Sequence, residues 1–368
     1  MARNRLEIRL DLIRKNYRTI QNAVSPLRTM AVLKADAYGL GVKAVRDALK
    51  AEGCFKFGVA DVIEAEAVSD GVSEIHILGD LLPEEVSSAV KGSFILPLTS
   101  LDSARRISKE AVTQNKTVNC QILLDTGMGR LGIISLNSFE TILKIFELPG
   151  LRISGIYSHF PFAYGDKKFS VAQIEKLKTL LAGLRERGIS FEEVHIANSD
   201  GIHNIPQAMQ APFNLVRTGI NLYGCFDLEG EKTLVLDEVV SLISRLVAVR
   251  DLPKGYSIGY GCTHVLQKDT KVGTVAIGYA DGLPIGLSNK GYFIINGHKC
   301  PVIGRVSMDY TTVDLSALQE VQVGQEVLCL GSGIPVSYWA ESGNTITYDI
   351  ICSIGNRVKR VYLDKPEV

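Results

Sequence analysis

The stretch Ala31–Gly41, AVLKADAYGLG, decides how the rest of the chain is interpreted. The apolar run at 29–33 predicts a buried strand, and Lys34 follows where that run stops. Tyr38 and two glycines then predict a turn before a helical pattern begins. A cation carried from an apolar strand into such a turn can be partly desolvated, which lowers its pKa and suits an amine nucleophile or base. A lysine at a strand end can equally be an ordinary solvated side chain, so the remaining sequence must decide.

Strand-like runs alternate with amphipathic helical patterns over roughly 200 residues after this point. The clearest helix is predicted at 170–187, where Ser170 and Gln173 form a capping box. Eight such units predict an α/β fold, a (β/α)8 TIM-type barrel. A doubly wound open sheet is the alternative, but no G-x-G-x-x-G follows the first strand. The predicted strands are 29–33, 56–60, 74–78, 94–98, 118–124, 151–158, 193–197 and 214–217.

The sequence changes character near residues 229–236. Beyond it, runs of Val, Ile, Thr and Tyr alternate with glycine turns, and Ile295-Asn296-Gly297 predicts a hairpin. We therefore expect a barrel domain at 10–232 and a mostly β domain at 233–368. Residues 5–10 alternate with period two, which predicts a short strand, and the N-terminal strand 1–9 is expected to join the second domain. Asp11 is expected to cap the first helix.

Composition excludes several classes of protein. The 368 residues carry 40 basic and 40 acidic side chains, so the zero net charge argues against a nucleic acid or anionic membrane partner. The seven cysteines are scattered and form no C-x-x-C motif, as is typical of a reducing compartment. The N-terminus has no apolar signal region, and no window is long and apolar enough to span a membrane. A cytoplasmic location is expected.

Polar residues of unusual type follow the predicted barrel strands, where the chemistry of such barrels is found. Each of them alone would be explained as a structural residue, but together they suggest an imine-forming amine, a phosphate site and a carboxylate site. Pyridoxal phosphate (PLP) with an amino acid substrate fits this set. No H-x-x-x-H, G-x-S-x-G or Walker A motif competes, so no metal site is expected. The residues are Lys34, Arg130, His159, Ser199 and Arg217.

The chain resembles the alanine racemase family, barrel-type PLP enzymes, along nearly its whole length. The resemblance depends on several motifs that occur in order. They are AVLKADAYGLG, LLDTGMGRLG, YSHF, ANSDG, LVRTGINLYG, SIGYG, AIGYADGLP, GRVSMDYTTVDL and IGNRVKRVY. The resemblance implies a PLP-dependent isomerase that interconverts L- and D-alanine by a two-base mechanism and supplies D-alanine for peptidoglycan.

The resemblance also implies roles for the catalytic residues. Lys34 matches the lysine that binds PLP covalently and acts as the base for the D-enantiomer. Tyr260 matches the base for the L-enantiomer, which reaches the site from a partner subunit, so a homodimer is implied. Arg217 matches the arginine that hydrogen-bonds the pyridine nitrogen, and His159 links the tyrosine to that arginine.

Binding roles follow from the same resemblance. Tyr38, Ser199, Gly219 and Ile220 match the phosphate-binding residues. Arg130 and the backbone of Met308 match the groups that bind the substrate carboxylate.

Four positions depart from the common pattern of the family. Leu123 stands where a carbamylated lysine often supports the neighbouring arginine, and Asn356 where a tyrosine often narrows the pocket. Ile285 and Tyr164 together replace an arginine and an aspartate of the access path. Asn356 leaves a serine or broad-specificity amino acid racemase open. Two further alternatives are a barrel-type PLP decarboxylase and a non-catalytic PLP carrier. A decarboxylase should carry a cysteine where this chain has Ser307.

Overall fold

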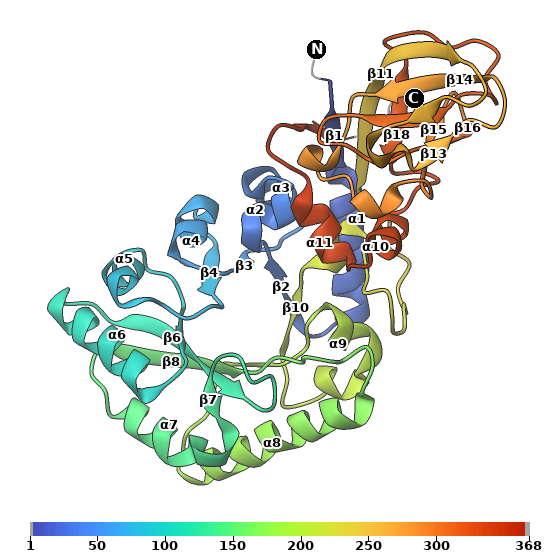
Figure 1. Cartoon of the computed structure of the whole chain (residues 1–368). Coiled ribbons are helices and arrows are strands. Elements are labelled where there is room, and N and C mark those ends of the chain that lie inside the picture. Colours follow the sequence, from blue (N-terminus) through green and yellow to red (C-terminus); the bar gives the residue numbers. More distant parts are fainter. Residues whose placement is uncertain (1–2, 365–368) are drawn as a thin grey trace.

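The computed structural model describes residues 3–364 and shows two domains (Figure 1). A barrel of strands and helices, blue to green in Figure 1, forms the larger domain. A mostly β domain, yellow to red with the N-terminal strand beside it, projects from one side of the barrel. Within the described residues, no helix has both the length and the apolar character needed to cross a membrane.

Eight parallel strands form the barrel wall: β2 (Arg28–Val32), β3 (Lys56–Val59), β4 (Glu74–Ile77), β5 (Leu96–Leu98), β6 (Val118–Asp125), β8 (Leu151–Tyr157), β9 (Glu193–His195) and β10 (Leu215–Thr218). Backbone pairing runs β10–β2–β3–β4 in one half and β5–β6–β8–β9 in the other, where β7 (Ile133–Ile134) also pairs with β6. A bridge between His76 and Ile95 joins β4 to β5, and Asn214 donates to the Val194 carbonyl at 3.1 Å between β9 and β10. The predicted barrel is confirmed, with every strand end within two residues of its expected position.

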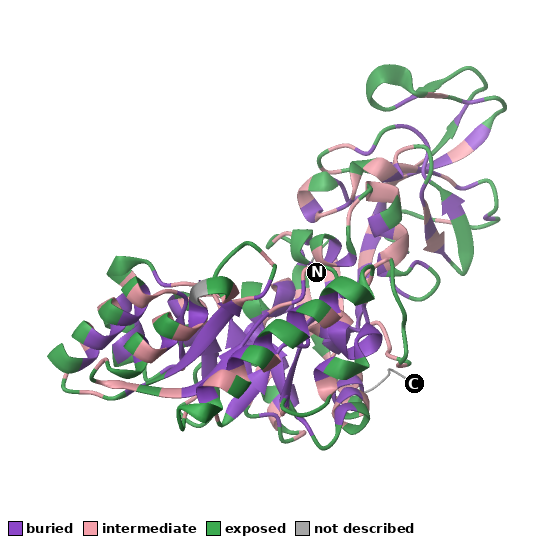
Figure 2. Ribbon diagram, turned by 90° about the horizontal axis from the view of Figure 1, so that it is seen from below, coloured by how far each residue is buried: buried purple, intermediate pink, exposed green. Residues whose placement is uncertain are grey.

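Helices cover the outside of the barrel: α1 (Leu10–Val24), α3 (Val42–Lys50), α4 (Val62–Val68), α5 (Val86–Lys91), α6 (Leu101–Thr113), α7 (Ser138–Phe146), α8 (Lys167–Glu186) and α9 (Ser199–Asn204). Figure 2 shows that the strands are buried and that the helices expose their outer faces. In α1, for example, Ile13, Tyr17, Ile20 and Val24 are buried at helical spacing. Burial of these apolar stripes against the strands provides the main driving force for the barrel.

Two predicted helix starts are wrong. The N-cap of α8 is Asp166, whose carboxylate accepts a hydrogen bond from the Phe169 N–H at 2.8 Å. Ser170 is instead buried within the first turn, where its hydroxyl donates to the Asp166 carbonyl. Asp11 lies in the first turn of α1 and accepts hydrogen bonds from the Arg9 guanidinium, rather than capping the helix. An earlier residue, Asp166, therefore caps α8, and an ion pair with Arg9 holds the Asp11 carboxylate at the start of α1.

The second domain is built on a sheet that contains β1 (Arg5–Arg9), β11 (Val240–Leu252), β14 (Thr270–Val275), β15 (Tyr292–Ile295), β16 (His298–Pro301), β17 (Thr311–Asp314), β18 (Glu326–Leu330) and β19 (Lys359–Leu363). The strand order is β16–β15–β18–β11–β1–β19, with β14 pairing with β11 and β17. A separate hairpin of β12 (Ser257–Ile258) and β13 (His264–Val265) carries the Tyr260 turn. The β15–β16 hairpin is confirmed, because Asn296 and Gly297 both adopt positive φ, 50° and 78°.

The N-terminal strand and two short helices connect the domains. β1 pairs antiparallel with β11 and parallel with β19, so the first strand of the sequence lies in the second domain's sheet. Helices α10 (Val336–Gly343) and α11 (Thr347–Ser353) pack together, and α11 packs against α2 (Lys34–Gly39) at the barrel mouth. One hydrophobic cluster runs through both parts. The fold class of a barrel with a C-terminal mostly β domain is therefore confirmed, while the domain limits at residues 232 and 233 stay a prediction.

Candidate active site

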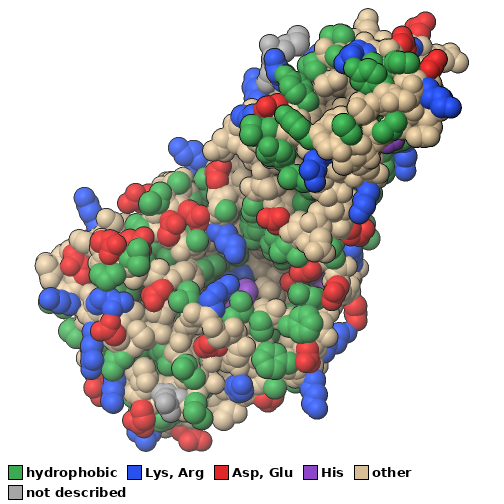
Figure 3. Space-filling model, in the orientation of Figure 1, with side chains coloured by type: hydrophobic (Ala, Val, Ile, Leu, Met, Phe, Trp, Pro, Cys, Tyr) green, Lys and Arg blue, Asp and Glu red, His purple; other side chains and the backbone are tan. Residues whose placement is uncertain are grey.

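A cavity of about 320 Å³ opens at the carboxyl ends of the barrel strands. Figure 3 shows it as a hollow whose wall contains Lys or Arg and His side chains. Seven of the predicted site residues line this cavity, and among the described residues no Asp or Glu does. A cavity with several cations and no acid is suited to an anionic ligand. The seven residues are Lys34, Tyr38, Arg130, His159, Ser199, Arg217 and Gly219.

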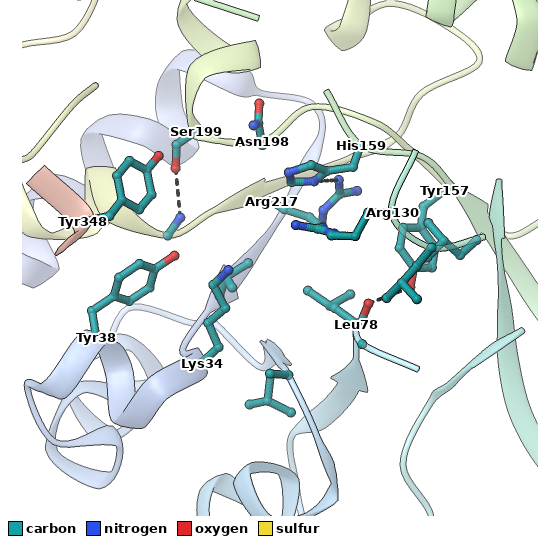
Figure 4. A pocket seen from close by; sticks show the side chains of 17 residues that line it. Lys34, Tyr38, Leu78, Arg130, Tyr157, His159, Asn198, Ser199, Arg217 and Tyr348 are labelled. Carbon is teal, nitrogen blue, oxygen red and sulfur yellow. Dashed lines mark hydrogen bonds between the residues drawn. The ribbon is translucent and has the colours of Figure 1, made fainter. Parts of the chain in front are cut away.

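Lys34 begins a turn of unusual backbone geometry. The four residues from Ala35 to Tyr38 have φ between 52° and 61°, so they form a left-handed turn without a glycine. Each such residue costs roughly 1–2 kcal/mol, and strain of this kind persists only where the surroundings fix it. Both oxygens of the Glu64 carboxylate supply such a restraint, because they accept from the Ala35 N–H at 2.7 Å and the Ala60 N–H at 2.8 Å. The turn directs Lys34 into the cavity (Figure 4).

The Lys34 amine faces the open cavity and forms no hydrogen bond or ion pair with any residue that the structure describes. The surrounding protein atoms desolvate the ammonium group, and the Arg130 guanidinium repels it. Both effects lower the pKa of Lys34, which increases the share of the neutral amine. A neutral amine is the form that acts as a nucleophile or a base.

Arg217 is held in place from several sides. It is only 4% exposed, and its Nη2 donates to the Ser158 carbonyl at 2.7 Å and contacts His159 Nδ1 at 3.2 Å. Its Nη1 bonds to His195 Nδ1, and its guanidinium lies 5.5 Å from the centre of the Tyr157 ring. Burial lowers the pKa of Arg217 to about 10, so the guanidinium remains charged at neutral pH.

His159 is electrostatically surrounded by cations. Burial and the charges of Arg217, Arg130 and Lys34 hold the pKa of His159 well below its ordinary value. The ring is therefore neutral near pH 7, and its Nδ1 can accept the hydrogen bond from Arg217.

The opposite end of the cavity carries hydroxyl groups. The Gly219 N–H donates to Ser199 Oγ at 3.0 Å, as drawn in Figure 4, and the Tyr38 and Tyr348 side chains extend into the same region. A Cβ added at Gly219 would lie 2.3 Å from Tyr38 Oη, so a larger residue here would displace this hydroxyl. These neutral donors, beside the cations, are suited to a phosphate group.

The loop that carries Arg130 is fixed through its backbone. The Asp125 carboxylate at the end of β6 accepts from the N–H groups of Gly127, Met128 and Gly129 at 2.8–2.9 Å. Arg130 is exposed and forms no ion pair or hydrogen bond within residues 3–364. Its guanidinium is therefore free to bind an anion, and the loop rather than a side-chain partner supports it.

Three predicted site residues lie outside the cavity. Ile220 is fully buried directly after Gly219, so only its backbone could contribute. Tyr260 and Met308 belong to the second domain and are 71% and 52% exposed. A single chain therefore does not bring Tyr260 or Met308 to Lys34.

The four residues that depart from the common pattern of the family lie in different parts of the structure. Leu123 lines the cavity together with Arg130, whereas Ile285 and Asn356 are exposed outside it. Tyr164 packs edge-on against Phe162, with ring centres 4.9 Å apart. Tyr164, which stands in place of the aspartate, is thus part of an aromatic pair.

Sequence reasoning missed several residues of the cavity. Tyr157 lies under Arg217 and could have been noticed, because it begins the YSHF motif that provides His159. Tyr348 comes from α11, more than a hundred residues after the barrel, and no local signal places it there. Within the described residues, no group of three or more His, Cys, Asp and Glu could hold a metal ion.

Two family models match the two parts of this chain. The family model "Alanine racemase, N-terminal domain" matches residues 8–227, and "Alanine racemase, C-terminal domain" matches residues 239–362. An alanine racemase of Desulforamulus reducens is 35% identical over 366 residues, which span 97% of this chain and 98% of the relative.

Solved structures agree with this match. The alanine racemase of Clostridium difficile 630 superposes with a TM-score of 0.93 at 28% identity, covering 100% of this chain and 97% of that one. The alanine racemase of Bartonella henselae, solved with covalently bound pyridoxal phosphate, gives a TM-score of 0.88 at 32% identity and covers 99% and 100% of the two chains. The chain belongs to the alanine racemase family.

Proposed function

We propose that this protein is a PLP-dependent isomerase that interconverts L-alanine and D-alanine. The observation that carries the proposal is a single cavity that holds the free Lys34 amine, the buried Arg217 guanidinium and the Arg130 guanidinium, with no carboxylate among its described lining residues. Such a site suits a cofactor that carries a carbonyl and a phosphate, together with a substrate that carries a carboxylate. The full-length relatives named alanine racemase support the same reaction.

The residues of the cavity fit PLP. The hydroxyl groups of Tyr38 and Ser199 both lie beside the Gly219 backbone, and they would form a compact set of donors for the phosphate. The backbone of Ile220 follows directly after Gly219. Arg217 would face the ring nitrogen, and Lys34 would hold the cofactor covalently. When bound, PLP withdraws electrons from the substrate and makes its α-proton acidic.

Two bases are needed, because racemisation removes the α-proton on one face and returns a proton on the other. Lys34 Nζ serves one face, and its lowered pKa favours the neutral form that accepts a proton. Tyr260 Oη serves the other face and comes from a second copy of the chain, with His159 linking it to Arg217. Arg130 and the Met308 backbone bind the substrate carboxylate. The high exposure of Tyr260 and Met308 in a single chain supports a homodimer with shared sites.

The cellular context follows from the reaction. We infer that the protein supplies D-alanine for peptidoglycan in the cytoplasm. Free thiols throughout the described part of the chain support a reducing compartment. A D-alanine auxotroph should grow without added D-alanine when it expresses this chain, and should not do so with Lys34→Ala.

A serine or broad-specificity racemase is the second candidate, and Asn356 is the observation that favours it. The decisive experiment incubates the holoenzyme with L-alanine, L-serine and L-lysine in separate reactions and measures both enantiomers and carbon dioxide. D-alanine as the dominant product supports the proposal, and equal or faster serine turnover supports the alternative. Carbon dioxide from lysine would indicate a decarboxylase, and no turnover would indicate a carrier.

A further inference from the structure

A line of buried polar side chains crosses the barrel interior below the cavity. Arg217 on β10 bonds to His195 on β9, whose Nε2 lies 2.9 Å from Gln121 Oε1 on β6. Gln121 Nε2 in turn donates to Glu193 Oε2 at 2.7 Å. Gln121 and His195 are 2% and 0% exposed. The interior of such barrels is normally filled by branched apolar side chains, so four linked polar residues require a reason.

The line ends in charges at the amino ends of the strands. Glu193 Oε1 lies 2.8 Å from Lys56 Nζ and 3.1 Å from Arg28 Nη1, beside a second cavity of about 270 Å³. A carboxylate as buried as Glu193, 5% exposed, stays ionised only if cations and hydrogen bonds replace its water. Although burial acts in the opposite direction, the bond to Lys56 and the neighbouring charges leave the pKa of Glu193 below its ordinary value.

An ionised Glu193 dictates the hydrogen positions of the whole line. A carboxylate can only accept, so Gln121 must turn its amide N–H₂ toward Glu193 and its carbonyl oxygen toward His195. His195 must then carry its proton on Nε2, and its Nδ1 is left unprotonated to accept from Arg217. Burial and the Arg217 charge hold the pKa of His195 well below its ordinary value, so the ring does not take a second proton.

The arrangement matters for Arg217. If His195 carried its proton on Nδ1, that proton would face the Arg217 N–H and the two donors would repel each other. The guanidinium would then have to move away from its contacts with Ser158 and Tyr157. A fixed His195 therefore fixes the position of the cation that faces the cofactor.

We propose that Gln121 and Glu193 are positioning residues for the racemisation site. They act through His195, whose tautomer they set together with Arg217, and thereby hold Arg217 in place from the opposite end of the barrel. The inference builds on the proposed function, since Arg217 is the cofactor contact, but the proton position on His195 can be measured without any turnover.

The test uses holoenzyme labelled with ¹⁵N-histidine, in which NMR distinguishes the two imidazole tautomers and His195→Asn identifies the signal. We expect the Nε2–H tautomer of His195 in the native chain from about pH 6 to about pH 9, across the ordinary histidine pKa. Gln121→Met, which keeps the volume but removes the amide, should give mixed tautomers. It should also lower kcat about tenfold, the range of other supporting-residue changes, with little change in KM.

Asn119→Ala is the matched control, because Asn119 lies on the same strand and bonds to Arg152 at 3.0 Å outside the line. It should leave both the tautomer and kcat unchanged. If Gln121→Met does not yield folded holoenzyme, Glu193→Gln provides the same readout, since its amide can offer either atom to Gln121 and both tautomers should appear.

An Nδ1–H tautomer in the native chain, or a native tautomer and kcat in the folded variant, would overturn the inference. A native chain with the expected tautomer but no racemase activity would instead overturn the proposed function alone.

Discussion

The cavity of the barrel and the Tyr260 turn of the second domain differ in how completely one chain builds them. In the barrel, Arg217 is 4% exposed and is bonded to Ser158, His159 and His195. In the second domain, which projects from the barrel (Figure 1), Tyr260 is 71% exposed in the turn of the β12–β13 hairpin. The first region is preorganised to bind a ligand, whereas the second presents an exposed tyrosine that does not line the cavity. This difference is the basis of the proposal that two copies assemble one reaction centre.

The largest effect is expected on the barrel side. In the proposed mechanism, Lys34→Ala removes both the covalent attachment of the cofactor and one base, so kcat should fall by roughly 10⁴-fold or more. Bound PLP should lose the absorbance of a lysine conjugate. The control is Lys43→Ala on α3 outside the cavity, which should retain full activity; equal loss in both variants would contradict the assigned role.

Arg130→Met tests the free cation at the cavity mouth. If Arg130 binds the substrate carboxylate as proposed, loss of this charge should lower kcat/KM by roughly 10²-fold, mainly through KM. The measurement is steady-state kinetics in both directions. Arg152→Met removes an arginine that is paired with Glu192 at the other end of the barrel, and it should leave KM unchanged. An unchanged KM in Arg130→Met would remove Arg130 from the binding site.

Glu64→Gln tests whether the left-handed turn is held from outside. The amide can still accept from one of the two N–H groups but presents its own N–H₂ to the other. The N–H that faces the new amide group loses a hydrogen bond worth about 0.5–1.5 kcal/mol, so the thermal midpoint should fall and PLP should bind roughly tenfold more weakly. Glu66→Gln on the exposed side of α4 is the control. Native PLP affinity in Glu64→Gln would show that the turn holds itself.

The smallest effect is a stability cost at the hydroxyl end of the cavity. Burial and the charge of Asp227 raise the pKa of Asp200 to about 6 in the folded chain, above its unfolded value. The folded state therefore favours the protonated acid, and this contribution to stability is present at low pH and is lost as the pH rises through about 6. Asp200→Asn should be more stable than the native chain by about 1 kcal/mol at pH 7.5 and equal to it near pH 4. Thermal unfolding at the two pH values checks this, and a pH-independent difference would contradict it.

The sequence predicts the barrel well because its strands are continuous apolar runs that end in turn residues. It also predicts that Lys34, Arg130, His159, Ser199 and Arg217 meet, since the carboxyl ends of parallel barrel strands share one face. The prediction depends on local pattern and chain order, which are properties that a sequence records directly.

Other features depend on contacts between distant residues. The left-handed turn contains alanines, which local preference would place in a right-handed helix, and a carboxylate from α4 stabilises it. His195 and Gln121 lie in strands that read as apolar and structural, yet they connect across the barrel. Tyr348 reaches the cavity only because α11 folds back onto α2. Nothing in the local pattern of these segments encodes those contacts.

The central claim, that Lys34 of one copy acts with Tyr260 of another, is tested most directly by mixing two inactive variants. Lys34→Ala and Tyr260→Phe subunits are dissociated together, reassociated with PLP and assayed for racemisation of L-alanine. Random pairing makes half of the dimers mixed, and each mixed dimer has one native site of two, so about a quarter of native activity should return. Activity that stays at the level of the separate variants, with mixed dimers present, would contradict the claim, because each chain would then build its whole site alone.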